Sequence, residues 1–276
     1  MTASGDLAHI ARGNPDFAGA VVALGALGVV TSVTLDIQPS FDVRQDVYSG
    51  LGWDALIAGF DSITASAYSV SVFTNWVDAG PTSVWLKTRL PGSPPDRLFD
   101  ATPLVVDTHM LSEQPPVNTT IQGGVPGPWS DRLAHFKLDF TPSAGEEIQS
   151  EYLIPRTNAV AAIEAMRVLG PRLQDALLIT ELRTMTADDL WLSPAQGRDT
   201  LGVHFTWRRD HDAVYGLLPA IEEALLPLGA RPHWGKAFVT TSLESQYPHW
   251  NDFRDLRDRS DPTRKFAGPF LDRVGL

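Results

Sequence analysis

The sequence predicts an α+β fold in which a mostly antiparallel sheet carries helices on one face. Two observations lead to this class. Strand-like runs alternate with helical runs along the chain, and residues 149–234 follow the order strand, helix, strand, strand, helix, strand. That order is typical of a split βαβ, or ferredoxin-like, unit. In front of it, residues 1–36 hold a short α–β unit without the neighbours that a complete domain supplies.

The composition limits the classes of protein that this chain can represent. It has 276 residues, 43% of them apolar, no cysteine and a formal net charge of -11. A chain of this length can bury a core without disulfides or a structural metal. The absence of cysteine excludes a disulfide framework, a cysteine-ligated zinc or iron–sulfur site and a catalytic thiol. The acidic balance argues against a nucleic-acid partner and against an anionic membrane surface.

Residues 17–35 form an uncharged stretch of nineteen residues, about the length of a membrane span. The stretch contains Gly19, Gly25 and Gly28, and its second half is β-branched. This pattern predicts a buried helix over residues 17–24 and a strand over residues 28–37 instead of a span. No basic region followed by an apolar core and a cleavage site opens the sequence, so we expect a cytoplasmic protein.

The period of the apolar residues predicts the remaining elements. Eight of the 21 prolines fall within residues 91–128, which predicts a long ordered loop because proline removes a donor that sheet pairing needs. Gly170-Pro171 is expected to stop one helix, and Pro219 to interrupt or kink another. The predicted strands are residues 41–48, 67–74, 82–90, 149–154, 176–185, 200–207 and 230–234, and the predicted helices are 53–62, 158–169, 212–228 and 249–258.

Polar residues occupy positions where a core strand should be apolar. Glu181 and Arg183 are two residues apart on one predicted strand, so their side chains share a face. This pair is either an ion pair on a solvated face or part of a binding surface, because charges on a sheet face cost desolvation unless they serve each other or a ligand. His204 and Thr206 share a face of another strand, and Lys236 ends a third.

If these strands are neighbours, one surface gathers donors, acceptors and a possible proton acceptor, which suits a small polyhydroxylated molecule. His204 alone would more often be a structural residue, so the argument depends on the set. Other chemistries fit less well. The sequence has no phosphate-binding loop and no Gly-x-Ser-x-Gly motif, and its seven histidines lack metal-ligand spacing, so we expect no metal. The adjacent acidic pairs Glu146-Glu147 and Asp188-Asp189 point apart, which argues against a glycosidase dyad.

Short motifs follow one another along nearly the whole chain. They are Pro15-Asp16-Phe17-Ala18-Gly19, Gly25-Ala26-Leu27-Gly28-Val29-Val30-Thr31, Tyr68-Ser69-Val70-Ser71-Val72-Phe73-Thr74, Gly124-Val125-Pro126-Gly127-Pro128-Trp129, Phe140-Thr141-Pro142-Ser143, Gln149-Ser150-Glu151-Tyr152, Glu181-Leu182-Arg183-Thr184, Trp191-Leu192-Ser193-Pro194, His204-Phe205-Thr206-Trp207, Arg231-Pro232-His233-Trp234-Gly235-Lys236 and Asp261-Pro262 with Lys265-Phe266. Together they resemble the C-terminal half of the alditol oxidase (xylitol oxidase) and D-arabinono-1,4-lactone oxidase family of vanillyl-alcohol-oxidase-type flavoproteins.

The resemblance implies FAD-dependent oxidation of the terminal hydroxyl of a polyol to an aldehyde, with O2 as acceptor and hydrogen peroxide as product. It implies substrate contacts at Glu181, Arg183, Thr206 and Lys236, with Glu181, Arg183, Lys236 and His204 as the catalytic set. Arg183 and Lys236 would hold the reacting oxygen and the developing charge of the flavin. The residues expected to touch FAD are Gly25, Gly28, Val29, Val30 and Thr31.

The chain departs from the family in two respects. The N-terminal flavin-binding half is missing, and Gly268 stands where the family usually has asparagine, two residues after the Lys-Phe pair. Residues 1–36 are therefore expected to be the last piece of an FAD-binding domain, and residues 37–276 the substrate-binding domain. We expect the chain alone to bind FAD weakly and to be inactive. It could be a truncated product, a chain with a mis-assigned start, or one half of a split enzyme with a separate flavin-binding chain.

Three alternatives stay open at this point. One is an oxidase of sugar lactones, and one is a non-catalytic polyol-binding or interaction module. The third is a hydrolase with Glu181 as base, which requires a second carboxylate nearby. Two geometric expectations test the reading. Glu181, Arg183, Thr206 and Lys236 should meet in one pocket on adjacent strands, and the unit at residues 17–37 should present an uncovered apolar face.

Overall fold

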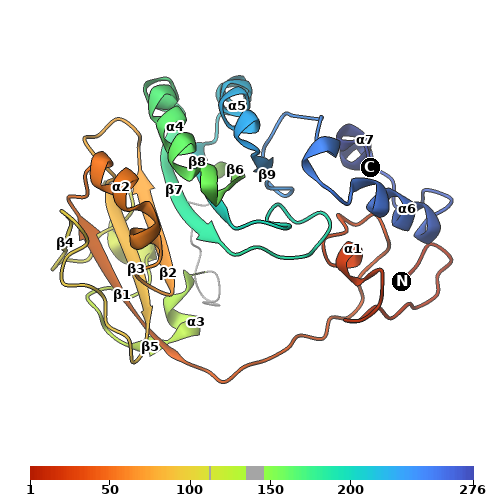
Figure 1. The fold of residues 1–276 in the computed structure, drawn as a ribbon, viewed down its shortest axis with the longest axis horizontal. Helices are drawn as coiled ribbons and strands as arrows, with labels where there is room; N and C mark the ends of the chain where they lie inside the picture. Colours follow the sequence, from red (N-terminus) through yellow and green to blue (C-terminus); the bar gives the residue numbers. More distant parts are fainter. Residues whose placement is uncertain (112, 135–145) are drawn as a thin grey trace.

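A computed structural model describes residues 1–111, 113–134 and 146–276. Nine strands in this part of the chain join one antiparallel sheet, and the longest helices lie on one of its faces (Figure 1). The predicted α+β class is confirmed. No helix of the described part combines the length and the apolar character needed to cross a bilayer.

The first half of the sheet is one βαββ unit followed by a short edge strand. Its four strands lie in the order β4-β1-β3-β2, and its helix α2 covers one face. The predicted strands and helix of this region are confirmed within a few residues. The elements are β1 (Asp42–Ser49), α2 (Trp53–Thr64), β2 (Ser69–Thr74), β3 (Ser83–Arg89) and β4 (Thr102–Pro103).

The second half is the predicted split βαβ unit. Its strands lie in the order β7-β8-β6-β9, which is the ferredoxin-like order and the same order as in the first half. The elements are β6 (Glu147–Pro155), α4 (Ala159–Leu173), β7 (Leu177–Met185), β8 (Thr200–Arg208), α5 (His211–Leu225) and β9 (Arg231–Pro232), with the 3₁₀ turns η3 (Arg156–Asn158) and η4 (Leu226–Leu228) beside the helices.

The two halves join where β2 pairs antiparallel with β7, with Phe73 opposite Glu181. Period two separates the side chains of this sheet into two faces. Leu182, Val203 and Tyr152 point to the face covered by α2, α4 and α5, where they enter the main core. Their chain neighbours Glu181, His204 and Glu151 therefore point to the opposite face.

That opposite face is covered over the first half by the excursion, which we define as residues 91–134. It contains η1 (Pro116–Asn118), β5 (Gly127–Pro128) and α3 (Trp129–Arg132), and β5 pairs with β1. Its Leu104, Met110 and Leu111 pack on a small apolar cluster of the sheet. The predicted proline-rich loop is thus an ordered cover for part of one sheet face.

The predicted helix stop at Gly170-Pro171 is wrong, and the helix at Pro219 is not interrupted. Helix α4 continues through Gly170 and Pro171 to Leu173, and α5 continues through Pro219. Gly170 has a packing role instead, since a Cβ at this position would lie 2.6 Å from the Cβ of Trp76. The glycine therefore permits close approach between α4 and the segment after β2.

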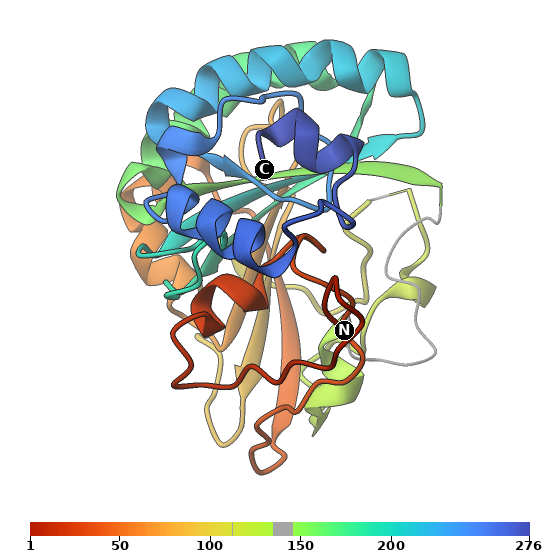
Figure 2. The ribbon, with the colours of Figure 1, turned by 90° about the vertical axis from the view of Figure 1, so that its right-hand side faces the viewer.

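The N-terminal segment gives a divided outcome. The predicted helix is present as the shorter α1 (Phe17–Val21), which packs near α6 (Trp250–Ser260). The predicted strand over residues 28–37 is wrong, because this part of the chain pairs with no strand. It runs past the sheet as an extended segment between α1 and β1 (Figures 1 and 2). Val30, Leu35 and Ile37 are 76%, 76% and 95% exposed, so the expected uncovered apolar surface is present.

Helix α1 itself is well packed. A Cβ on Gly19 would lie within 2.7 Å of atoms of Trp191 and of Leu256 on α6, so only glycine allows this approach. The backbone N–H of Trp191 donates to the carbonyl of Ala18 at 3.0 Å. The C-terminal region ends with η5 (Glu244–Gln246), α6 and α7 (Pro269–Val274).

Candidate active site

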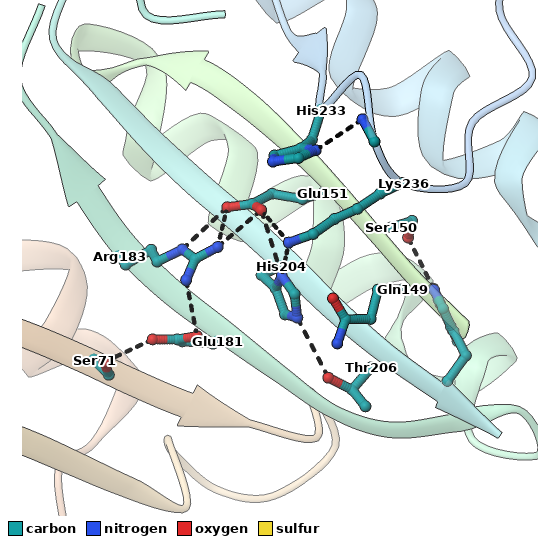
Figure 3. A network of polar contacts seen from close by, with 12 residues as sticks. Ser71, Gln149, Ser150, Glu151, Glu181, Arg183, His204, Thr206, His233 and Lys236 are labelled. Carbon is teal, nitrogen blue, oxygen red and sulfur yellow. Dashed lines mark hydrogen bonds and ion pairs between the residues drawn. The ribbon is translucent and has the colours of Figure 1, made fainter. Parts of the chain in front are cut away.

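The register of three strands brings charged side chains together on the open face of the second half. Glu181 on β7 is opposite His204 on β8, and His204 is opposite Glu151 on β6. Because neighbouring strands lie only about 4.8 Å apart, the three side chains form one row across the sheet. Arg183 stands two residues from Glu181 on the same face (Figure 3).

Glu151 is the centre of this network. Its side chain is 1% exposed and contacts two cations. Arg183 donates from Nη2 to Oε1 at 2.7 Å and to Oε2 at 2.8 Å, and from Nε to Oε1 at 3.0 Å. Lys236 donates from Nζ to Oε2 at 2.5 Å. Glu151 therefore fixes the positions of both cations at once (Figure 3).

Lys236 also contacts His204, with 2.7 Å between Nζ and Nδ1. The same Nδ1 lies 3.4 Å from Oε2 of Glu151, and the other ring nitrogen of His204 is Nε2. That Nε2 lies 3.4 Å from Oγ1 of Thr206. The imidazole thus connects Lys236 to the hydroxyl of Thr206.

Glu181 links the network to the first half of the sheet. Ser71 on β2 donates to its Oε1 at 2.6 Å, and Nη1 of Arg183 lies 3.5 Å from its Oε2. From β3 to the loop after β9, charged groups then alternate in sign. They are Lys87, Glu181, Arg183, Glu151 and Lys236.

Burial and charge shift the ionisation of the network. Burial raises the pKa of Glu151, but its contact with His204 and the charges of Arg183 and Lys236 outweigh burial and hold that pKa far below the usual range. Burial lowers the pKa of Lys236, although Glu151 opposes this. Burial and the charge of Lys236 also lower the pKa of His233. Glu151 therefore stays ionised at neutral pH.

The network lines a cavity of about 670 Å³, a size typical of small-molecule sites. Its floor is the sheet, with Arg183 and His204 from the second half and Ser71 and Lys87 from the first. Its other walls include residues of the excursion. These are His109, Met110, Leu111, Gln114, Pro115, Val117, Asn118, Thr119, Thr120, Leu133 and Ala134.

The structure brings five of the predicted site residues together. All of Glu181, Arg183, His204, Thr206 and Lys236 line this one cavity. The expectation of adjacent strands fails for one of them, since Lys236 lies in the loop after β9 and reaches past β6. The motif at residues 140–143 and His135 lie outside the described residues.

The sequence interpretation missed Glu151 as a site residue. A usable signal was present, because Glu147, Gln149 and Glu151 are polar at alternate positions of a strand whose other face is apolar. Glu151 is also the second carboxylate that the hydrolase alternative required. It is buried and bonded to two cations, so it is unsuited to proton exchange with a substrate, and the hydrolase reading loses support.

The residues expected to hold FAD lie apart from the cavity lining. Gly25, Gly28, Val29, Val30 and Thr31 are absent from it. Val29 bonds to Met1 through both its backbone groups, at 3.0 Å and 2.6 Å, and is 55% exposed, with Val30 76% exposed. This exposed apolar edge and the cation Lys236 at the cavity fit two features of a flavin site, an uncovered contact surface and a charge for the reduced ring.

Comparison of folds defines the class of protein first. A VAO-type flavoprotein from Myceliophthora thermophila aligns with a TM-score of 0.54 over 82% of this chain and 46% of its own. The 6-hydroxy-D-nicotine oxidase of Arthrobacter nicotinovorans aligns with a TM-score of 0.57 over 96% of this chain and 63% of its own. Both are 15% identical in sequence, so they establish that the chain has the fold of part of a VAO-type flavoprotein.

Sequence comparison gives the particular family. Residues 143–274 match the family model of D-arabinono-1,4-lactone oxidase. An alditol oxidase of a Streptomyces species is 45% identical over 98% of this chain, and the chain spans 65% of its length. An L-gulono-1,4-lactone dehydrogenase of Mycobacterium tuberculosis is 29% identical over 99% of the chain and 67% of its own length. Residues 143–274 thus match the D-arabinono-1,4-lactone oxidase family model, and nearly the whole chain is similar to part of an alditol oxidase.

Proposed function

We propose that this chain is the substrate-binding part of an FAD-dependent oxidase of sugar alcohols. The reaction would convert a terminal –CH2OH to an aldehyde and O2 to hydrogen peroxide. The observation that carries this proposal is the charged network in which Glu181, Arg183, His204 and Lys236 line one cavity and the buried Glu151 pairs with two of them. It is supported by the 45% identity to an alditol oxidase.

Each network residue has a proposed role. Arg183 and Lys236 bind the oxygen that reacts, because both are cations held in place by Glu151. Glu181 and Thr206 bind neighbouring hydroxyls of the polyol, since one accepts hydrogen bonds and the other both donates and accepts. Glu151 and His204 act as positioning residues that hold Lys236.

The hydroxyl of the substrate must lose its proton. Burial lowers the pKa of Lys236, so a larger fraction of it is unprotonated than of a lysine in water. The Nδ1 atom of His204 already contacts Lys236 and Glu151, which favours a positioning role for the imidazole over direct proton abstraction. We therefore propose that the unprotonated fraction of Lys236 accepts this proton and, once protonated, holds the reacting oxygen together with Arg183.

FAD, when bound, would accept the hydride, which carries the two electrons of the oxidation, from the carbinol carbon. We propose that Gly25, Gly28, Val29, Val30 and Thr31 contact it, within a remnant of a flavin domain at residues 1–36, and that residues 37–276 form the substrate domain. The flavin half would come from further protein sequence or from a separate chain. The cytoplasm is the proposed location, because a chain without cysteine uses no disulfides.

Two other functions have specific support. An oxidase of sugar lactones is favoured by the family matched at residues 143–274. A polyol-binding module without turnover is favoured by the position of the residues expected to hold FAD, since none of Gly25, Gly28, Val29, Val30 and Thr31 lines the cavity.

Titration calorimetry on the purified chain tests the proposal. We expect xylitol and sorbitol to bind, and Arg183→Met to weaken binding by about tenfold or more. The matched control is Arg97→Met, because Arg97 is exposed on the excursion. Binding of sugar lactones but not of alditols would support the lactone oxidase. Addition of FAD then distinguishes the alditol oxidase from the non-catalytic polyol-binding module. Release of hydrogen peroxide with xylitol would exclude the module, whereas polyol binding without turnover would support it. An absence of binding by either class of ligand would overturn the proposal.

A further inference from the structure

Lys87 lies in the half of the cavity farthest from Lys236. It is on β3, and the strands β2, β7, β8 and β6 separate β3 from β9 and the loop that holds Lys236. Lys87 is opposite Ser69 on β2 and opposite Gln45 on β1. Its side chain lines the same cavity as Lys236 and Arg183. The cavity therefore has a cation toward each of its ends.

The two ends differ in how their cations are paired. Lys236 and Arg183 are both bonded to Glu151, but no carboxylate of the described residues lies within 4.0 Å of the ammonium of Lys87. The charge of Glu181 acts on Lys87, yet the oxygens of Glu181 already contact Ser71 and Arg183.

An unpaired ammonium at a mostly enclosed position is costly. Burial lowers the pKa of Lys87 to about 8, although the charge of Glu181 opposes this shift. Lys87 is therefore still mainly protonated at neutral pH. A cation that is held without a counter-ion beside a ligand cavity indicates that the ligand brings the negative charge.

The surroundings of Lys87 define the chemistry of that ligand. Ser69, opposite Lys87 on β2, and Tyr68 line the same cavity, as does Asn118 of the excursion, whereas the hydroxyl of Ser71 already donates to Glu181. The rings of Trp85 and Phe73 supply an apolar surface on the same floor. One ammonium with hydroxyl donors suits a singly charged carboxylate, while the rest of the wall suits a hydroxylated carbon chain.

We propose that Lys87 is a distal anchor for a carboxylate, so that the cavity takes a polyhydroxy acid with its acid group at Lys87 and its terminal carbinol at Arg183 and Lys236. This inference rests on the proposed function and narrows its substrate class. β3 and β7 are two strand spacings apart, about 10 Å. The guanidinium of Arg183 turns from β7 toward Glu151 on β6, away from β3, so the acid has to extend across β2 and β7 to contact both cations.

The test compares gluconate with sorbitol, which share a six-carbon hydroxylated chain and differ at one end by a carboxylate. Calorimetry at pH 7 on the purified chain should show gluconate binding about tenfold or more tighter than sorbitol. Lys87→Met should abolish this preference and leave sorbitol affinity within about threefold. Lys87→Arg should retain most of it, because the charge is kept.

Arg89→Met is the matched control, since Arg89 lies on the same strand but is exposed and outside the cavity lining. It should leave the preference for gluconate unchanged. Sorbitol binding without a preference for gluconate would overturn the anchor alone. Loss of the preference for gluconate in the Arg89→Met variant would also overturn the anchor. The preference would then come from long-range attraction to nearby cations and not from contact with Lys87. Tighter binding of sorbitol 6-phosphate through Lys87 would overturn the assignment to a carboxylate, and no binding of any of these ligands would overturn the proposed function as well.

Discussion

The two halves of the sheet have the same strand order but use their open faces differently. In the second half, β6, β7 and β8 present Glu151, Glu181 and His204 in one row. In the first half, the same face of β1, β2 and β3 presents the apolar Val47, Phe73 and Trp85 under the excursion. One topology thus supplies both a charged floor and an apolar floor for a single cavity.

The difference shows that topology places side chains while residue type decides their use. Both halves bury an apolar face under helices, so the strands need only period two to leave the other face available. The second half stabilises its polar face with ion pairs around Glu151. In the first half the excursion covers this face, and Gln45 on β1 hydrogen-bonds to Thr120 of the excursion.

The largest effect is expected for Glu151→Gln. Removing this charge leaves Arg183 and Lys236 in contact with a neutral amide, so the free energy of unfolding should fall by about 3–5 kcal/mol. Urea denaturation at pH 7 measures it. Glu164→Gln, at an exposed position of α4, should change it by less than about 0.5 kcal/mol. A loss below about 1 kcal/mol for Glu151→Gln would mean that the network does not depend on this carboxylate.

The sequence predicted the sheet better than it predicted the network. Alternation of apolar residues identified the six long strands β1, β2, β3, β6, β7 and β8, because each strand buries one face. The failures have physical causes. Residues 28–37 have strand composition, but the described chain offers them no partner strand. Gly170 has the sequence character of a helix stop, but its missing side chain serves contact with Trp76.

The site was predicted in part. Glu181, Arg183, His204 and Thr206 stand out because they are polar on strands that begin apolar. Glu151 and Lys87 were missed because their importance comes from register with strands far away in the sequence. A carboxylate between two cations, or an ammonium without a carboxylate, is visible only once β6, β7 and β3 are placed side by side.

The next effect has the opposite sign, since Lys87→Met should stabilise the protein at pH 7. Unfolded Lys87 titrates near 10.5 and the folded residue near 8. Between these values the unfolded state binds more protons, so stability rises with pH, and the full cost of the buried charge is present below pH 8. The shift corresponds to about 2–3 kcal/mol. This gain should appear in urea denaturation at pH 7 and shrink toward pH 10.

Glu181 is the charged neighbour that acts on Lys87. Arg89→Met is the control variant. Its effect on the free energy of unfolding should be small and the same at pH 7 and pH 10. A Lys87→Met variant less stable than the parent at pH 7 would show that Lys87 has a stabilising partner.

A smaller loss is expected for Gln45→Leu in the first half. Gln45 is fully buried, donates to the carbonyl of Thr120 at 2.9 Å and accepts from its hydroxyl at 3.0 Å. Leucine removes both bonds and leaves the two groups of Thr120 unpaired, which should cost about 1–2 kcal/mol. Urea denaturation gives the loss, and hydrogen exchange at residues 119–122 should accelerate. Equal losses of unfolding free energy for Gln45→Leu and Glu151→Gln would show that the neutral hydrogen bonds of the first half stabilise the protein as much as the ion pairs of the second half.

The smallest effect concerns the junction of the halves, where Ser71 on β2 bonds to Glu181 on β7 at 2.6 Å. Ser71→Ala should lower stability by about 1 kcal/mol, because a bond to a carboxylate is lost at a site open to the cavity. It should also weaken polyol binding, since Glu181 then lacks one of the two contacts that hold it. Ser69→Ala, two residues earlier on the same strand face, removes a hydroxyl without touching this bond and should leave stability unchanged. If both variants behave alike in urea denaturation and in sorbitol titration, the halves are joined by backbone pairing alone and Glu181 is positioned entirely from within the second half.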